Sequence, residues 1–402
     1  MLFGRRIWKH LQPAEKDSLF GVKEEFRKSA AKNKLSLALG EYHTEEGRPF
    51  VLSCVKKAEK TLLEEETNKS YSPISGDASF LSLSTKLTFG GSAKNAVAFQ
   101  TPGGTGALRL GGELLRKFHP QAAIYASDPT WPVHGKIFAA CGFAPNSYRY
   151  LDSDKNAFSF AHMAADLEEI PDGSVVLLHA CAHNPTGFDP TREEWRALEE
   201  IISRKSHVPF FDMAYQGLSS GDFDADAFPV RYFAEKKNPL LVAKSFSKNM
   251  GLYGERLGTL EILCSEDETD TVRAWGEEIA RKTYSNPPIH GARIARRILE
   301  TLEAEWKKEV EEMSDRLRGK RKALRESLDR LSGSSHDWSY IEKQTGMFCH
   351  TGLSRRQVDL LREKHAIFLP VSGRVCIAAL PEKDIARVAA GLADVADICA
   401  GL

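Results

Sequence analysis

Short runs of apolar residues alternate with amphipathic stretches between about residue 95 and residue 265. This alternation is typical of a mostly parallel sheet covered by helices. Thr191 and Glu194 form a capping-box pattern, which predicts a helix from there to about Ser203. We expect the strands at residues 96–100, 123–127, 175–179, 209–212 and 240–244.

The pattern changes after Pro288, where apolar residues recur every three or four positions from Ile294 to Leu317 within a highly charged stretch. This spacing predicts a long helix that could bridge two domains. An exposed coiled coil is the alternative, although the heptad register drifts. From about Ser335, two strand-like runs and a final helix are enough for a smaller domain.

Composition favours a small-molecule partner. The chain has 55 Lys and Arg against 55 Asp and Glu, so no net field would recruit nucleic acid or an anionic membrane. No apolar stretch approaches the roughly 18 residues of a membrane helix. The 7 cysteines include no CxxC pair, which indicates reduced thiols in a cytoplasmic compartment. Arg5, Arg6 and Lys9 could belong to a short targeting peptide, but an ordinary N-terminal arm fits better.

Lys248 stands just after a predicted strand, in the segment from Ala243 to Arg256. An isolated lysine is usually exposed, but the mouth of a parallel sheet can desolvate one and hold it for Schiff-base chemistry. Ser245 and Arg256 flank it with a hydroxyl and a permanent cation, groups that suit a phosphate monoester.

A second anion-binding pattern runs from Thr101 to Arg109 and includes Gly104 and Thr105. Its glycines precede an amphipathic helix, whose N-terminus offers backbone N–H groups and partial positive charge to a phosphate. A glycine-rich turn alone is a weak signal. Together with the Lys248 segment it becomes a strong one.

Two further segments end predicted strands, where ligands bind in open parallel sheets. One contains Asn184 within His-Asn-Pro-Thr-Gly, and the other contains Asp212 and Tyr215. A buried Asp212 needs a cationic partner, and a protonated pyridine nitrogen would be one. Asn184 and Tyr215 could both donate to a ring oxygen. The alternative for these segments is an ordinary turn and a core tyrosine.

A metal site is the competing chemistry. His179, Cys181 and His183 are metal-ligand types at alternate positions along a strand. The sequence contains no second cluster of metal-ligand residues, and a metal site would not explain the phosphate-binding patterns. We therefore expect no metal.

These motifs, in this order, resemble the class I aminotransferases of fold type I, in the aspartate and aromatic amino acid aminotransferase branch. The likeness runs from about Leu35 to the end and includes Gly-Arg374-Val. It implies an α/β fold: a large domain with a mostly parallel seven-stranded sheet flanked by helices, and a smaller α/β domain. We expect an arm and part of the small domain in residues 1–40, the large domain in 41–312 and the rest of the small domain in 313–402.

The resemblance also implies pyridoxal 5'-phosphate as cofactor and a role for each matching residue. Lys248 would carry the cofactor and move the proton, Asp212 would pair with the pyridinium, and Asn184 and Tyr215 would donate to the ring's 3-oxygen. The remaining matches comprise a phosphate cup of Gly104, Thr105, Ser245 and Arg256, a stacking Trp131, the α-carboxylate clamp Arg374, and Gly40 beside the substrate. Supporting positions are His134, His183 and Ser247.

Tyr71 and Arg281 resemble residues that reach the site from a neighbouring subunit, which implies a homodimer with shared sites. Tyr71 would contact the cofactor and act in catalysis, and Arg281 would bind substrate. The expected reaction, part of amino acid metabolism, moves the amino group of aspartate, phenylalanine or tyrosine to 2-oxoglutarate. Glu41 and His43 depart from the family's lid pattern, so the preferred donor is open. The alternatives are a fold-type I decarboxylase or lyase and an inactive binding homologue.

Overall fold

The computed structural model describes residues 18–66, 68–91, 95–152, 154, 156–332, 336–396 and 398. The N-terminal arm, with Arg5, Arg6 and Lys9, falls largely outside these residues, as does Cys399. The six described cysteines are free thiols. Within the described part, no helix combines the length and apolar character needed to cross a bilayer.

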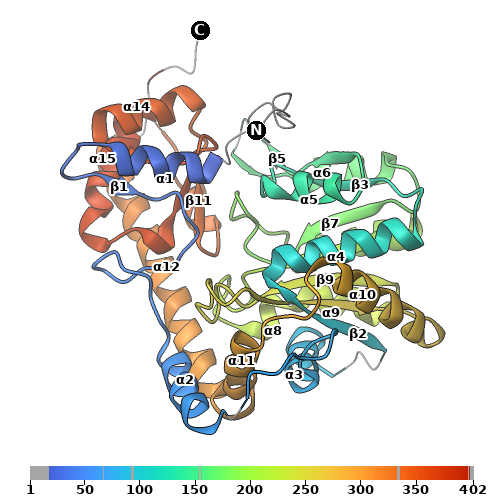
Figure 1. Cartoon of the computed structure of the whole chain (residues 1–402). Coiled ribbons are helices and arrows are strands. Elements are labelled where there is room, and N and C mark those ends of the chain that lie inside the picture. Colours follow the sequence, from blue (N-terminus) through green and yellow to red (C-terminus); the bar gives the residue numbers. More distant parts are fainter. Residues whose placement is uncertain are drawn as a thin grey trace, which may run out of the picture.

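A seven-stranded sheet forms the centre of the larger part of the molecule (Figure 1). Its spatial order is β2 (Ala96–Pro102), β10 (Leu257–Leu263), β9 (Leu240–Ser245), β8 (Val208–Met213), β7 (Val175–His179), β3 (Ile124–Asp128) and β4 (Pro145–Arg149). Only β10 runs antiparallel to its neighbours, and the other pairings are parallel. The predicted sheet and its five predicted strands are confirmed, while β10 and the edge strand β4 were not predicted.

Helices cover both faces of the sheet because successive side chains on its strands point to opposite sides. Phe210 and Phe211 show this directly, since each packs into a different hydrophobic cluster. One face carries α4 (Gly103–Phe118), α5 (Val133–Ala140) and α10 (Thr269–Thr283), and the other carries α3 (Ala78–Phe89), α6 (Phe160–Glu169), α7 (Arg192–Arg204) and α9 (Phe228–Glu235). The predicted capping box of Thr191 and Glu194 starts α7.

The predicted long helix is two helices, so that expectation was wrong in detail. α11 (His290–Thr301) ends at Leu302, whose backbone leaves the helical region, and α12 (Glu303–Ser332) follows at once. α12 packs against α15 (Ile385–Ala396), and its residues Trp306 and Val310 are fully buried. It is therefore part of the globular core and not an exposed coiled coil.

Both ends of the chain build the smaller part of the molecule. β1 (Leu35–Ser36) pairs in parallel with β12 (Ile367–Phe368), and α1 (Ser18–Lys28) packs beside them (Figure 1). The remaining elements of this part are α13 (Tyr340–Lys343), β11 (Phe348–His350), α14 (Arg355–His365) and β13 (Arg374–Cys376).

Two further elements lie outside this smaller part. α2 (Ser53–Glu65) lies against α11, and the hairpin of β5 (Leu151–Asp152) and β6 (Ala157–Phe158) follows β4.

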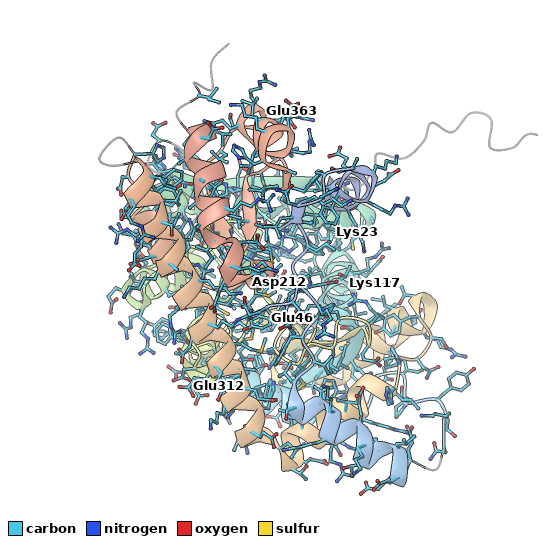
Figure 2. The ribbon with its side chains drawn as sticks, turned by 90° about the vertical axis from the view of Figure 1, so that its left-hand side faces the viewer. Lys23, Glu46, Lys117, Asp212, Glu312 and Glu363 are labelled. Atoms are coloured by element: carbon cyan, nitrogen blue, oxygen red, sulfur yellow. The ribbon has the colours of Figure 1, made fainter. Side chains whose placement is uncertain are left out.

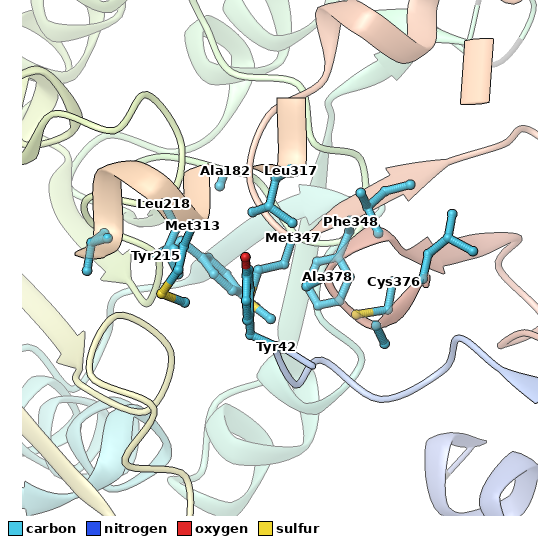
Figure 3. Packing of buried hydrophobic residues seen from close by; sticks show 14 of the residues in the cluster. Tyr42, Ala182, Tyr215, Leu218, Met313, Leu317, Met347, Phe348, Cys376 and Ala378 are labelled. Carbon is cyan, nitrogen blue, oxygen red and sulfur yellow. The ribbon is translucent and has the colours of Figure 1, made fainter. Parts of the chain in front are cut away.

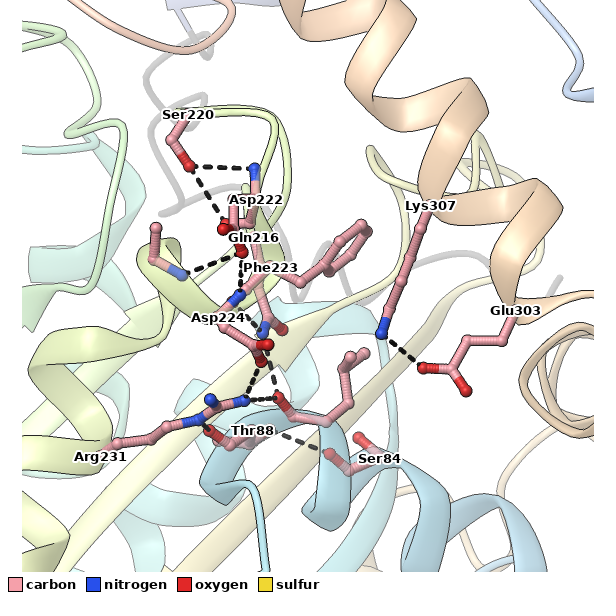
Figure 4. A network of polar contacts seen from close by, with 12 residues as sticks. Ser84, Thr88, Gln216, Ser220, Asp222, Phe223, Asp224, Arg231, Glu303 and Lys307 are labelled. Atoms are coloured by element: carbon pink, nitrogen blue, oxygen red, sulfur yellow. Dashed lines mark hydrogen bonds and ion pairs between the residues drawn. The ribbon is translucent and has the colours of Figure 1, made fainter.

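A shared core joins the two parts. Tyr42, Tyr215, Met313 and Phe348 come from distant stretches of the chain and belong to one hydrophobic cluster (Figure 3). Hydrogen bonds hold the loop after β8 in place, because Gln216 donates to the carbonyl oxygens of Leu87 and Phe223 (Figure 4). Gln216 thus ties the loop that carries Tyr215 to α3 and to the start of α8 (Phe223–Asp226).

Candidate active site

A pocket opens where β7, β8 and β9 end and α4 begins. Since these three strands are parallel, their carboxyl ends meet at one edge of the sheet. The pocket brings together most of the residues that the sequence singled out: Gly40, Gly104, Thr105, Trp131, Asn184, Asp212, Tyr215, Ser245, Ser247, Lys248, Arg256 and Arg374.

Lys248 follows β9 by three residues and is partly buried. Its Nζ lies 5.4 Å from the centre of the Tyr215 ring. Burial lowers the pKa of Lys248, and the positive charges of Arg256 and Arg374 lower it further, while Asp212 opposes them. A lysine with a lowered pKa has more of the neutral amine that Schiff-base formation requires.

Asp212 lies in β8, inside the molecule, whereas labelled surface residues such as Glu312 lie at its periphery (Figure 2). His134 is its partner, with 2.9 Å between Nε2 and the Asp212 carboxylate. Burial alone would raise the pKa of Asp212, but the hydrogen bond to His134 and nearby positive charge outweigh burial and lower it. The carboxylate therefore stays ionised and can accept from a protonated ring nitrogen.

A chain of hydrogen bonds fixes the tautomer of His134. The backbone N–H of Asn184 donates to Nδ1 of His179 (3.2 Å), so a neutral His179 carries its proton on Nε2. That nitrogen donates to the Thr130 hydroxyl (3.2 Å), which then donates to Nδ1 of His134 (2.9 Å). The proton of His134 is thereby placed on Nε2, facing Asp212.

The two histidines considered for a metal site have hydrogen-bond partners on both ring nitrogens. His183 bonds the Ser127 hydroxyl through Nε2 and the Thr186 hydroxyl through Nδ1, each at 2.8 Å. Both ring nitrogens of His179 also have partners, namely Thr130 and the Asn184 backbone. Among the described residues, no group of three or more His, Cys, Asp or Glu side chains has metal-site geometry.

The phosphate-binding pattern opens into the pocket as expected. Gly104 and Thr105 form the first turn of α4, where backbone N–H groups lack helical partners. Ser245 lies so close that a Cβ at Gly104 would be 3.2 Å from the Ser245 Cβ. With Arg256 on the same pocket wall, the site combines a helix N-terminus, a hydroxyl and a cation. These groups fit a phosphate dianion.

Arg374 is held in place by hydrogen bonds and an aromatic ring. Its guanidinium donates to the Asn184 side-chain oxygen (2.9 Å) and the Ala38 carbonyl (2.6 Å), and lies 3.9 Å from the centre of the Phe348 ring. Its buried Nε has no partner. A Cβ at Gly40 would fall 2.7 Å from the same ring, so a side chain there would displace this platform.

Trp131 and Tyr215 supply the aromatic walls. Trp131 meets the ring of His134 edge to face, with 5.2 Å between the ring centroids. Tyr215 is buried, and desolvation raises the pKa of its phenol, so it remains a hydrogen-bond donor. Both residues line the pocket next to Lys248.

Tyr71 and Arg281 do not join the pocket of their own chain. Tyr71 is 89% exposed, and Arg281 is also exposed. The two segments are nevertheless neighbours, because Asn286 accepts from Arg281 (3.4 Å) and donates to the Ser72 carbonyl (2.8 Å). The two segments therefore lie side by side, and neither Tyr71 nor Arg281 lines this chain's own pocket.

Glu41 also points elsewhere. Its carboxylate lies 3.4 Å from Nε2 of His43, and this hydrogen bond, together with charge from His43 and Lys23, lowers the pKa of Glu41. Glu41 does not line the pocket, although Gly40 does. The departure from the lid pattern at Glu41 is thus turned toward His43.

Sequence reasoning missed several pocket residues. Phe348, Ala214, Leu108 and Leu19 line the pocket, and Thr130 relays the histidine contacts. Thr130 could have been found, since it directly precedes Trp131 in a recognisable motif. The four pocket-lining residues are apolar and carry no local signal of a ligand site.

Comparisons with known proteins agree with this geometry. The family described as aminotransferase class I and II matches residues 32–392. Aspartate aminotransferase 1 of Medicago sativa is 44% identical over 392 residues, covering 95% of this chain and 94% of the relative. Other aspartate aminotransferase relatives are named as mitochondrial, chloroplastic or cytoplasmic forms.

Solved structures are similar over nearly the whole chain. An aromatic-amino-acid aminotransferase from Burkholderia pseudomallei, covalently bound to pyridoxal phosphate, has a TM-score of 0.94 at 38% identity and covers 97% of this chain and 100% of its own. A broad-specificity aminotransferase from Leishmania mexicana has a TM-score of 0.93 at 39% identity, with 97% and 98% covered. The predicted fold, enzyme class and pyridoxal phosphate cofactor are confirmed, and the chain belongs to the class I and II aminotransferases.

Proposed function

We propose that this chain transfers the amino group of aspartate, and also of phenylalanine and tyrosine, to 2-oxoglutarate. The observation that carries the proposal is the position of Lys248, which shares one pocket with Asp212, the phosphate-binding groups and Arg374. The names of the relatives and neighbours, which include aspartate, aromatic and broad-specificity aminotransferases, support the substrate range.

In the proposed mechanism, Lys248 is the residue that transfers the proton. When bound, pyridoxal phosphate supplies an electron sink for the pair of electrons left on the substrate α-carbon. Lys248 Nζ would hold the cofactor in the resting enzyme and, once released, would take the proton from the substrate α-carbon and return it to the cofactor's C4′. Asp212, kept ionised by His134, holds the ring nitrogen protonated, and Trp131 stacks on the ring.

Other residues of the pocket orient the reactants. Asn184 and Tyr215 donate to the ring's 3-oxygen. Gly104, Thr105, Ser245 and Arg256 line the pocket, and these residues would hold the phosphate. Arg374 binds the substrate α-carboxylate beside Gly40, through charge-assisted hydrogen bonds worth about 1.5–3 kcal/mol each.

We further propose a homodimer in which each site is completed by the partner. The exposed Tyr71 and Arg281 on neighbouring segments support this arrangement, because neither residue lines the pocket of its own chain. Tyr71 would contact the cofactor, and Arg281 would bind the distal carboxylate of aspartate. For aromatic substrates, Arg281 would move aside.

We also propose the expected domain division and a cytoplasmic location. The proposed boundary between residues 312 and 313 lies inside α12, so this helix would belong to both domains. The first boundary, between residues 40 and 41, follows Gly40 at the pocket. A cytoplasmic location is favoured by the cysteine pattern.

An amino acid panel with 2-oxoglutarate tests the proposed function. Purified protein loaded with pyridoxal phosphate should form glutamate from aspartate, phenylalanine and tyrosine, and each donor should yield its oxo acid in equal amount. Consumption of a donor without glutamate would instead indicate a decarboxylase or lyase. Glutamate from aspartate alone would remove the aromatic substrates from the proposal.

A further inference from the structure

Asp189 is a partly buried carboxylate that lies outside the pocket, five residues after Asn184. It accepts the backbone N–H groups of Ala182 (2.7 Å) and His183 (3.0 Å). The Thr345 hydroxyl donates to it (3.0 Å), and the Ser219 hydroxyl lies 3.3 Å from the same carboxylate and 2.8 Å from the Thr345 hydroxyl oxygen. Asp189 is thus the centre of a connected polar cluster.

The two backbone bonds hold an unfavourable turn. Ala182 has φ of +50°, a left-handed conformation that a residue with a Cβ disfavours. This turn leads the chain from the end of β7 to Asn184. Without the carboxylate, two buried N–H groups would lose their acceptor and the turn would lose its support.

The two hydroxyl bonds come from other parts of the site. Ser219 belongs to the loop after β8 that carries Tyr215. Thr345 belongs to the segment before β11, and its backbone N–H donates to the Gly187 carbonyl (2.7 Å). Three residues later in that segment, Phe348 lies under Arg374 and packs edge to face with Tyr215, with 5.9 Å between the ring centroids. Figure 3 shows Tyr215 and Phe348 in the same cluster.

We propose that Asp189 is a positioning residue that fixes Asn184 and Tyr215 relative to the platform of Arg374. It does so by joining the three segments that carry Asn184, Tyr215 and Phe348. This inference rests on the proposed roles of Asn184, Tyr215 and Arg374. Asp189 itself does not line the pocket.

The test compares variants of the holoenzyme by two readouts: the pH titration of the visible cofactor band without substrate, and KM with kcat for aspartate. Asp189→Asn presents an NH2 group to at least one former donor. It should shift the titration midpoint by about half a pH unit or more. It should also raise KM about ten-fold.

Variants that lack a single hydroxyl group distinguish a positioning role of Asp189 from a role in folding. They also keep the test valid if Asp189→Asn does not fold. Thr345→Val removes the hydroxyl that links Asp189 to the Arg374 platform and that also bonds the Ser219 hydroxyl (2.8 Å), so it should raise KM about three-fold or more. Ser219→Ala should shift the midpoint through Tyr215. Ser174→Ala is the matched control, because it removes a buried hydroxyl bonded to the Pro171 carbonyl, away from the pocket, and should change neither readout.

The inference is overturned if folded Asp189→Asn keeps the wild-type midpoint and KM. It is also overturned if Thr345→Val and Ser219→Ala both behave like the Ser174→Ala control. A wild-type protein without a visible cofactor band or without transamination would instead overturn the proposed function.

Discussion

Arg374 donates a hydrogen bond of 2.9 Å to the side-chain oxygen of Asn184. The amide nitrogen of Asn184 is then the donor that remains for a ligand in the pocket. A carboxylate bound by Arg374 competes for the same guanidinium. Substrate binding is therefore coupled to the side chain that we propose faces the cofactor's 3-oxygen.

Arg374→Ala should reduce activity toward all donors to a similar degree, because every amino acid presents an α-carboxylate. We expect kcat/KM for aspartate and for phenylalanine to fall by about two to three decades each. Arg149→Ala, which removes an exposed arginine paired with Asp166, is the control and should retain activity. A loss confined to one donor would show that Arg374 does not read the shared carboxylate.

Arg281→Ala should discriminate between donors, because only aspartate carries a distal carboxylate. Its kcat/KM should fall by about two to four decades, from roughly 3–5 kcal/mol for breaking a buried pair. Phenylalanine should lose far less. Steady-state kinetics with both donors measures this, and equal losses would contradict the role given to Arg281.

Two variants with little activity toward aspartate should complement each other in a mixed dimer. Co-expression of Lys248→Ala with Arg281→Ala allows dimers in which one site has both residues intact, so part of the aspartate activity should return. Each variant expressed alone is the control. Sedimentation that finds only monomers, or mixed dimers without recovered activity, would refute sites shared between subunits.

His179 should make the fold sensitive to acid. Burial lowers the pKa of His179 to about 3, so the unfolded chain binds a proton first as pH falls. The contribution of neutral His179 to the free energy of unfolding is fully present above about pH 6.5 and is lost as the pH falls toward about 3. The free energy of unfolding then falls by up to about 1.4 kcal/mol per pH unit.

The measurement compares denaturant unfolding of wild type and His179→Gln between about pH 6.5 and 4.5. Gln retains an acceptor for the Asn184 N–H but cannot take up a proton. Its free energy of unfolding should therefore fall less steeply with acid. Parallel curves for the two proteins would mean that His179 is not held neutral by the fold.

The sequence predicted those parts of the site that are encoded locally. Lys248, Asp212 and Asn184 each follow or end a short apolar strand, and parallel strands bring such positions together. The partner of Asp212 could not be read in this way, because His134 lies 78 residues earlier. The Phe348 platform under Arg374 was also hidden, since an aromatic residue in a short strand reads as ordinary core.

The same limit explains the errors in the fold. β10 contains Glu261, which reads as exposed, yet this residue is buried and accepts the hydroxyl of Ser84 at 2.6 Å from α3. The break at Leu302 keeps the apolar spacing on both sides, so periodicity alone joined two helices into one. A contact between residues distant in the sequence leaves no pattern in the local sequence, and neither does a small change in the direction of a helix.

The most direct test of the central claim is reductive trapping of the cofactor. Holoenzyme is treated with borohydride, which fixes pyridoxal phosphate to the lysine that holds it, and the modified peptide is identified by mass spectrometry. The modification should fall on Lys248 alone, with about one group per chain, and should disappear in Lys248→Ala. Trapping on another lysine, such as the buried Lys244, or none at all in active wild-type enzyme, would contradict the account.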